Sequence, residues 1–261
     1  MPTVTTTDPT RIVSLAPSAT ATVTEVGAED RLVGVTTHCD ADAPTLGGWL
    51  NTDPERVAEA EPDVVLTADG LQRDLRDDLR DHGLPVHHVE PSTLEETLDS
   101  IQSVATAVGA AEAGAELVAD CRARIDHVRR TTPNSAENRP VVYCEEWHDP
   151  PMAAGNWVPE AVEAAGGRYP FVEPGDRSAE VSEARVVDAE PDHAVLHHCG
   201  HGERAEPEIL AERGWTLDAE VHVFDDDLLN QPSPRLVDGI EALAERLHGV
   251  DPLDADSSGR E

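Results

Sequence analysis

The sequence contains no lysine: all 19 of its basic residues are arginine, against 53 aspartates and glutamates. The formal net charge at pH 7 is therefore -34. Nucleic acids and anionic membranes are bound through basic patches, so neither is expected as a partner of so acidic a surface. Because carboxylates that repel one another weaken the compact state unless salt screens them, the composition indicates an acidic, halophilic protein.

Paired cysteines and long apolar runs are also absent. The four cysteines are far apart and form no Cys-x-x-Cys motif, so neither a zinc knuckle nor a thioredoxin-like motif is present. No apolar run has membrane-spanning length, and the start, MPTVTTTDPT, lacks a basic region followed by an apolar stretch. We therefore predict a cytoplasmic protein without a membrane span, or an extracellular one if translation starts upstream of Met1.

Catalytic motifs are missing as well. The sequence has no Gly-x-Ser-x-Gly turn, no His-Glu-x-x-His pair and no glycine-rich nucleotide loop. The many carboxylates are explained by the acidic surface without any acid–base role. We expect a protein that is not an enzyme and that requires no cofactor.

What the sequence does contain is a regular alternation of strand and helix patterns. Short apolar runs, typical of buried strands, occur at 11–15, 31–35, 63–67, 85–89, 141–145, 193–197 and 221–224. Helical patterns separate most of them, and one at 111–130 carries its apolar residues on one stripe. Twenty helical residues extend about 30 Å, enough to cross from one lobe to another.

This pattern predicts an α/β fold with two lobes and a connecting helix. The expected boundaries are an N-terminal lobe at 11–109, an interlobe helix at 110–131 and a C-terminal lobe at 140–249. The tails, 1–10 and 250–261, are polar and are expected to be disordered.

Four segments carry a resemblance to a known family. They are RIVSLAPSATATVTEVGAEDRLVGVT, LNTDPERVAEAEPDVVLT, EEWHDPPMAAGNWVPEAVEAAGG and QPSPRLVDGIEALAERLHG. Together they resemble the substrate-binding proteins of the vitamin B12 (cobalamin) and iron-complex ABC importers, most closely a cobalamin-binding branch. The resemblance covers about 11–249 and implies two Rossmann-like lobes, a rigid interlobe helix and a ligand cleft between the lobes.

The function implied is non-enzymatic binding of cobalamin or a related corrinoid, by an importer receptor or an intracellular carrier. Such a protein is expected to be a monomer that docks an ABC permease. In the resembling importers, acidic residues on each lobe meet arginines of the permease. Here Arg73 occupies roughly the first of these places, and Glu203, Glu206 and Glu208 surround the second.

Tryptophans are the first candidates for ligand contact. A corrinoid is large, flat and partly apolar with amide edges, so its site needs broad aromatic faces and a few polar groups. Trp147 and Trp157 lie in CEEWHDPPMAAGNW, which we expect to be a loop following a strand, and Trp49 lies in a loop of the first lobe. Packing in the core is the alternative for each of them.

Polar candidates accompany the tryptophans. Glu146 ends the strand beside Trp147 and could accept hydrogen bonds from ligand amides. Ser14 begins SLAPS, between the first strand and the first helix, and a helix N-terminus with small hydroxyl residues can hold an anionic group. The resemblance places a Cys-Gly pair at the cleft, which favours ligand contact by Cys199.

Histidines provide an alternative interpretation. His38 could coordinate the cobalt of a cobalamin or another transition metal. His198 and His201 belong to the cluster HHCGH, but neighbouring strand residues point to opposite faces, so at most two or three of its ligands converge. The second hypothesis is thus a metal-binding protein or metal-dependent enzyme using His38, Cys199 and His201. An iron–siderophore or haem complex is a further ligand that the same cleft could take.

Overall fold

The computed structural model describes residues 9–133, 138–200 and 204–249. The chain divides into two compact units: unit 1 comprises 1–91 and 98–119, and unit 2 comprises 92–97 and 120–261. Most of the two expected tails, together with His201 and Glu203, lies outside the described residues. None of the described helices combines the length and the apolar character that a membrane span requires.

Unit 1 is built on a five-stranded sheet in the order β3-β2-β1-β4-β5, in which every pairing is parallel. Its elements are β1 (Ile12–Ser14), α1 (Pro17–Glu25), η1 (Glu29–Arg31), β2 (Leu32–Thr36), β3 (Thr45–Gly47), α2 (Pro54–Glu59), β4 (Val64–Ala68), η2 (Gly70–Gln72), α3 (Arg73–Asp81), β5 (Val86–Val89), and parts of α4 (Leu94–Ala107) and α5 (Ala111–Thr131). The predicted strands and helices of this half are present, and β3 is an addition.

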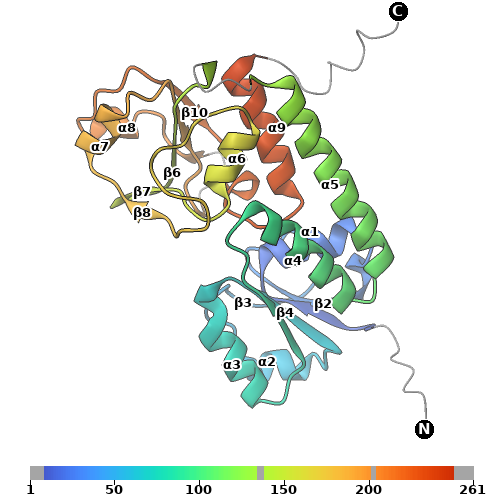
Figure 1. Cartoon of the computed structure of the whole chain (residues 1–261). Helices are drawn as coiled ribbons and strands as arrows, with labels where there is room; N and C mark the ends of the chain where they lie inside the picture. Colours follow the sequence, from blue (N-terminus) through green and yellow to red (C-terminus); the bar gives the residue numbers. More distant parts are fainter. Residues whose placement is uncertain (1–8, 134–137, 201–203, 250–261) are drawn as a thin grey trace, which may run out of the picture. The chain divides into compact units, whose positions relative to one another are not determined.

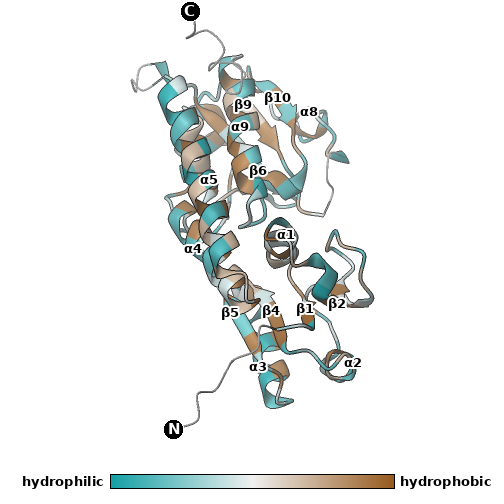
Figure 2. Ribbon diagram, turned by 90° about the vertical axis from the view of Figure 1, so that its right-hand side faces the viewer, coloured by the Kyte–Doolittle hydropathy of each residue, from teal (hydrophilic) through white to brown (hydrophobic). Residues whose placement is uncertain are grey.

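Helices cover both faces of the unit 1 sheet (Figure 1). Ile12 packs in one core with residues of α1 and the end of α4, while its neighbour Val13 packs in a second core with residues of α2 and α3. Successive strand residues point to opposite faces, so a strand that is apolar at every position requires cover on both sides. This explains the uninterrupted apolar runs, which Figure 2 shows as brown strands.

Unit 2 contains a mixed five-stranded sheet in the order β10-β9-β6-β7-β8. Its elements are β6 (Val142–His148), β7 (Pro151–Ala153), α6 (Val158–Ala164), β8 (Ala179–Glu180), α7 (Glu183–Asp188), β9 (His193–Leu196), α8 (Ile209–Glu212), β10 (Glu220–Val223), η5 (Asp226–Leu228) and α9 (Arg235–His248), with the second part of α5. Strands β10, β9 and β6 are parallel, whereas β7 and β8 are antiparallel to their neighbours.

The long helix predicted at 110–131 is α5, and the division between the units falls inside it. Val118, Cys121, Ile125 and Val128 of its apolar stripe are buried. At Gly114 a Cβ atom would lie 2.4 Å from the Cβ of Ala105, so α5 approaches α4 where only glycine fits. With the two sheets, this helix confirms the predicted fold class.

The segment CEEWHDPPMAAGNW is not the loop that the sequence predicts. Strand β6 continues through Trp147 to His148, turns at Asp149-Pro150 and pairs antiparallel with β7. The prolines hid this hairpin, since proline usually interrupts a strand. Pro151 is tolerated because it is the first residue of β7.

Candidate functional site

The candidate residues lie where parallel strands end. In open α/β sheets ligands bind outside the carboxyl ends of the strands, because the loops there can project side chains and backbone groups. In unit 1, His38 follows β2 and Trp49 follows β3; in unit 2, Trp147 lies near the end of β6 and Cys199 follows β9. Each unit therefore has its own carboxyl edge with candidate side chains.

A buried glutamine fixes the Trp49 loop in unit 1. Gln72 is fully buried, and its side-chain amide donates hydrogen bonds to the carbonyl oxygens of Leu15 (2.8 Å) and Trp49 (2.6 Å). Its carbonyl oxygen accepts from the backbone N–H of Ala68 at 2.8 Å. One side chain thus ties together the loop after β1, the loop after β3 and the end of β4, and it holds the half-buried Trp49 at this edge.

Ser14 and His38 have different surroundings at the same edge. Ser14 is fully buried: its hydroxyl donates to the carbonyl oxygen of Ala16 (3.3 Å) and accepts from the Thr20 hydroxyl (2.8 Å). Its side chain therefore stabilises the turn into α1 and presents no exposed hydroxyl to a ligand. His38 is exposed, and its backbone N–H donates to the Thr36 hydroxyl at 3.4 Å.

In unit 2 a buried carboxylate organises the end of β6. Glu145 is fully buried, and its two oxygens accept from both terminal nitrogens of Arg213 at 2.8 and 2.6 Å. The Tyr143 hydroxyl donates to it at 2.7 Å, and Nε2 of His198 lies 3.0 Å from its Oε1. Burial alone would raise the pKa of Glu145, but these hydrogen bonds outweigh burial and lower the pKa to about 2. The group is an ionised, fully paired anchor.

A row of rings connects this anchor with the surface. The His198 ring lies 5.3 Å from that of His148, and the His148 ring stacks on Trp147 at 6.0 Å and 29°. Trp147 is 41% exposed, and its indole N–H donates to the carbonyl oxygen of Asp149 at 2.9 Å inside the same hairpin. The hairpin therefore holds the indole in one orientation with exposed ring surface.

Trp157 does not have the exposed ring that the predicted ligand contact requires. It is 4% exposed, and its indole N–H donates to the carbonyl oxygen of Leu229 at 2.7 Å. The packing alternative describes its position, because both its ring surface and its one donor are used inside unit 2.

The two described histidines of HHCGH, His197 and His198, also make contacts inside unit 2. His197 is fully buried, its Nδ1 bonds Oδ1 of Asn230, and burial lowers its pKa to about 4. Nε2 of His198 is directed at Glu145. Within the described residues, the groups spaced closely enough to hold a metal ion include neither His38 nor His198, and His201 lies outside those residues.

Cys199 and Glu146 are brought together. The backbone N–H of Cys199 donates to the carbonyl oxygen of Glu146 at 2.9 Å, so the loop after β9 continues beside the end of β6. Cys199 is exposed and Glu146 half-buried. Partial burial of the thiol, with Asp226 and Glu146 nearby, raises the pKa of Cys199 and keeps it a neutral thiol.

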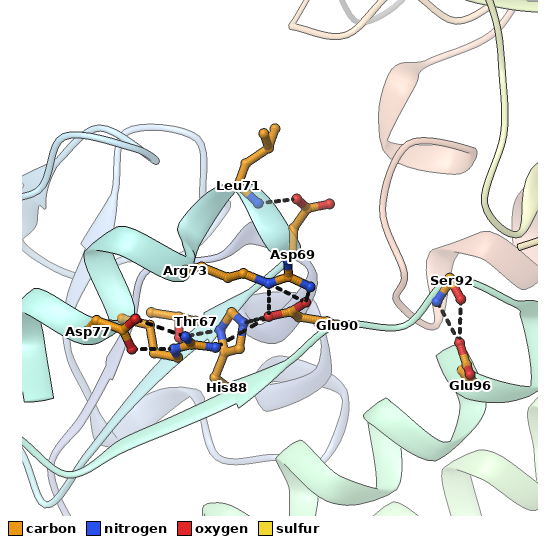
Figure 3. A network of polar contacts seen from close by, with 10 residues as sticks. Thr67, Asp69, Leu71, Arg73, Asp77, His88, Glu90, Ser92 and Glu96 are labelled. Carbon is orange, nitrogen blue, oxygen red and sulfur yellow. Dashed lines mark hydrogen bonds and ion pairs between the residues drawn. The ribbon is translucent and has the colours of Figure 1, made fainter. Parts of the chain in front are cut away.

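Arg73, the residue considered for permease docking, is paired within unit 1 (Figure 3). Its Nε donates to both oxygens of Glu90 at 2.9 and 2.8 Å, and Nε2 of His88 lies 2.7 Å from the same carboxylate. The Arg73 hydrogen bonds chiefly lower the pKa of Glu90 to about 2. The exposed basic charge at this edge is thus offset by a carboxylate beside it.

Three residues that shape these edges carried no signal in the sequence analysis. Gln72, Arg213 and Asn230 act on partners 57, 68 and 33 residues away in the chain. No local pattern indicates such contacts.

The two-sheet fold with a connecting helix defines the class of the protein. The chain belongs to the periplasmic binding protein family, whose model matches residues 12–233.

Curated relatives match most of this chain and have related names. A vitamin B12-binding protein of Vibrio cholerae serotype O1 is 28% identical over 253 residues, covering 89% of this chain and 87% of that protein. A cobalamin-binding protein of Halobacterium salinarum is 25% identical over 260 residues, covering 93% of this chain and 70% of that protein. The predicted family is confirmed, and with it a solute-binding rather than an enzymatic protein.

Solved structures share the fold. The periplasmic vitamin B12 binding protein BtuF of Vibrio cholerae matches with a TM-score of 0.73 and 24% identity, covering 92% of this chain and 97% of that one. The periplasmic haem binding protein HutB of Vibrio cholerae matches with a TM-score of 0.79 and 17% identity, covering 91% of this chain and 98% of that one. At these identities the likeness establishes the two-lobe class.

The predicted cytoplasmic location is wrong. The family and the matching structures are periplasmic binding proteins, which points to an extracytoplasmic protein. The expectation depended on the first residues of the chain alone. A targeting segment is separate from the folded protein and is removed from it, so the composition of the folded part does not reveal the location.

Proposed function

We propose that this protein binds cobalamin or a closely related corrinoid and delivers it to an ABC importer. The observation that carries the proposal is the exposure of its few aromatic side chains. Of four tryptophans, two tyrosines and two phenylalanines, six are buried; of the other two, Trp49 is half-buried and Trp147 is exposed. Each of the two lies at the carboxyl edge of its own unit, where a flat ligand would need an aromatic face.

The polar groups beside these rings favour a ligand with uncharged amide edges. Glu146 can accept hydrogen bonds from amides, the Cys199 thiol is neutral, and His38 is an exposed imidazole able to reach a metal centre. Arg73 and Arg213, by contrast, are already paired with carboxylates. Haem and many siderophore complexes carry carboxylates or other anionic groups. Because these two arginines are already paired, such a ligand would be repelled by the net negative charge of the protein.

The names of the curated relatives support the same ligand. Two of them, from Vibrio cholerae and from Halobacterium salinarum, are called vitamin B12-binding and cobalamin-binding proteins. We propose that Trp49, Trp147, Glu146, Cys199 and His38 contact the corrinoid. Delivery would require an ABC permease, and its contact can be tested at the Arg73–Glu90 pair of unit 1 and at the exposed Glu206 and Glu208 of unit 2.

A titration of the purified chain with cyanocobalamin, followed by tryptophan fluorescence and calorimetry, tests the proposal. We expect one equivalent to bind, and Trp147→Ala to weaken binding by about tenfold or more while the melting temperature is kept. Trp147→Phe should restore much of the affinity, because a smaller aromatic face remains. Val187→Ala, which truncates another exposed apolar side chain, is the matched control.

Binding of haemin in place of cyanocobalamin would overturn the proposed ligand. Unchanged cyanocobalamin affinity in both Trp49→Ala and Trp147→Ala would overturn the proposed site.

We further propose that the protein functions at high salt. Its net charge of -34 without lysine requires screening if the compact state is to be stable. The melting temperature should rise by about 2–4 °C or more between low and molar KCl, which corresponds to roughly 1 kcal/mol. A flat dependence on salt would remove the idea.

A further inference from the structure

A group of potential metal ligands lies in unit 2, away from the candidate site. His193 begins β9, and Glu220 and His222 lie in β10. One ligand atom from each residue can be chosen such that all lie within 4.8 Å of one another. The candidate site follows the carboxyl end of β9, whereas His193 and Glu220 are the first residues of their strands, at the amino edge.

The strand register explains why these side chains converge. In the parallel pair β9 and β10, His193 is opposite Glu220 and Val195 is opposite His222. Residues opposite one another share a face of the sheet, and residues two apart along a strand share it as well. His193, Glu220 and His222 therefore project from the same face.

The distances within the group match a shared ion. Nδ1 of His193 lies 3.0 Å from Nε2 of His222, and the two rings are stacked with centroids 5.2 Å apart. Two imidazole nitrogens at about 2.0–2.1 Å from one metal ion are separated by about 2.9–3.4 Å in octahedral or tetrahedral geometry. The carboxylate of Glu220 lies 4.0 Å from Nε2 of His222, close enough for a small rotation to complete the set.

The surroundings of the group are mixed in charge. The pKa of His222 is lowered by burial, raised by Glu220, and lowered by His193 and Arg246. The pKa of His248 is lowered mainly by burial and, to a smaller extent, by the nearby His193. The C-terminal turn of α9 thus brings Arg246 and His248 near the group. Arg246 opposes a cation there, and the exposed Glu220 supplies the compensating negative charge.

We propose that His193, His222 and Glu220 bind a divalent transition-metal ion of the zinc class. Two imidazoles and one carboxylate are a ligand set that such ions accept, with water in the remaining positions. The ion would link β10, the edge strand of the sheet, to β9. It would also be accessible for exchange, because Glu220 is exposed and His193 is half-buried.

Titration of the full chain, freed of metal with a chelator, tests this site with Zn²⁺ in calorimetry and with Co²⁺ as a spectroscopic probe. We expect one equivalent of each ion to bind, with the visible bands of Co²⁺ coordinated by nitrogen and oxygen. His193→Gln and His222→Gln should each weaken binding by at least about tenfold. Glu220→Gln should cause a smaller loss. Circular dichroism of each variant checks that it is folded.

Control variants separate this site from other histidines. His82→Gln, which removes an exposed histidine of unit 1, should leave the affinity unchanged. Cyanocobalamin binding should be unchanged in His193→Gln, so failure of the metal site and failure of the proposed function are distinguishable. Absence of binding at micromolar metal would overturn the proposal. So would affinity that persists in both His193→Gln and His222→Gln and is lost in Cys199→Ser.

Discussion

The two units position their candidate tryptophans by different means. In unit 1 the fully buried amide of Gln72 ties the loops after β1 and β3 to the end of β4 through hydrogen bonds to backbone groups. In unit 2 an ionised carboxylate, Glu145, is held by Arg213, Tyr143 and His198, and the rings stacked beyond it lead to Trp147. One edge depends on neutral hydrogen bonds and the other on a buried charge.

The two units also differ in their sheets and in their aromatic content. Unit 1 has an all-parallel sheet with helices on both faces and Trp49 as its one aromatic residue. Unit 2 has a mixed sheet and contains the other aromatic residues, two of which, Phe171 and Trp215, pack against Tyr143. A buried charge strengthens its partners' orientation but leaves a large penalty when one partner is removed. Unit 2 is therefore expected to be the more sensitive of the two to substitution and to acid.

The largest effect should come from removing a partner of the buried charge. Arg213→Met leaves Glu145 buried without its two strongest hydrogen bonds and should cost about 3–5 kcal/mol in the free energy of unfolding. Arg129→Met is the control, because the Arg129–Asp126 pair is exposed and should contribute less than about 1 kcal/mol. Urea denaturation measures both, and equal losses would show that the Glu145 network is no more important than a surface pair.

Loss of the neutral anchor in unit 1 should have a smaller effect. Gln72→Ala leaves the carbonyl oxygens of Leu15 and Trp49 and the N–H of Ala68 without their partner, which should cost about 1–3 kcal/mol. It should also weaken cyanocobalamin binding by releasing the Trp49 loop. Gln102→Ala, which removes a half-buried glutamine of α4, is the control for loss of a glutamine. A Gln72→Ala protein that keeps both its stability and its affinity would contradict the assigned role.

The smallest effect is the contribution of His197, in unit 2, to the dependence of stability on mild acid. Burial lowers the pKa of His197 from 6.5 to about 4, so between these values the unfolded chain binds a proton that the folded chain does not. With respect to His197, the free energy of unfolding is therefore highest above pH 6.5. It decreases as the pH falls, by about 1 kcal/mol between pH 6.5 and 5.5. Glu145, whose folded pKa is about 2, adds a further loss only below pH 4.5.

Urea denaturation of wild type and His197→Gln at several pH values measures this contribution. The variant should have a flatter dependence between pH 6.5 and 5.5, because the titrating group is gone. Identical slopes in the two proteins would assign the acid sensitivity to other groups.

Secondary structure was largely predictable where a segment is long or uniformly apolar. Burial of a strand on both faces produces a continuous apolar run, and a packed helix produces a stripe such as that of α5, so both are recorded locally in the sequence. Strands β3, β7 and β8 have three, three and two residues and were not predicted. Segments so short, with glycine or proline in two of them, have too few positions to show a period.

The places of several candidate residues at strand ends were predictable from the sequence, and their exposure was less so. Residues that follow predicted strands could be assigned to the carboxyl edges, as His38 and Cys199 were, whereas Trp49 could be assigned only to a loop because β3 was not predicted. Whether a tryptophan at such a place is exposed depends on what packs over it. Trp147 and Trp157 lie ten positions apart in one segment, yet one is 41% and the other 4% exposed.

The sequence by itself determined the α/β class and the acidic character of this protein, which follow from local periodicity and from composition, and it indicated the family through the resemblance of four segments. The tertiary structure decided which of the few aromatic rings keep an exposed face and which histidines are held by internal partners. It also paired Glu145 with Arg213 and brought His193 next to His222. These contacts join residues 29 to 68 positions apart, and chain folding alone brings such residues within hydrogen-bonding distance.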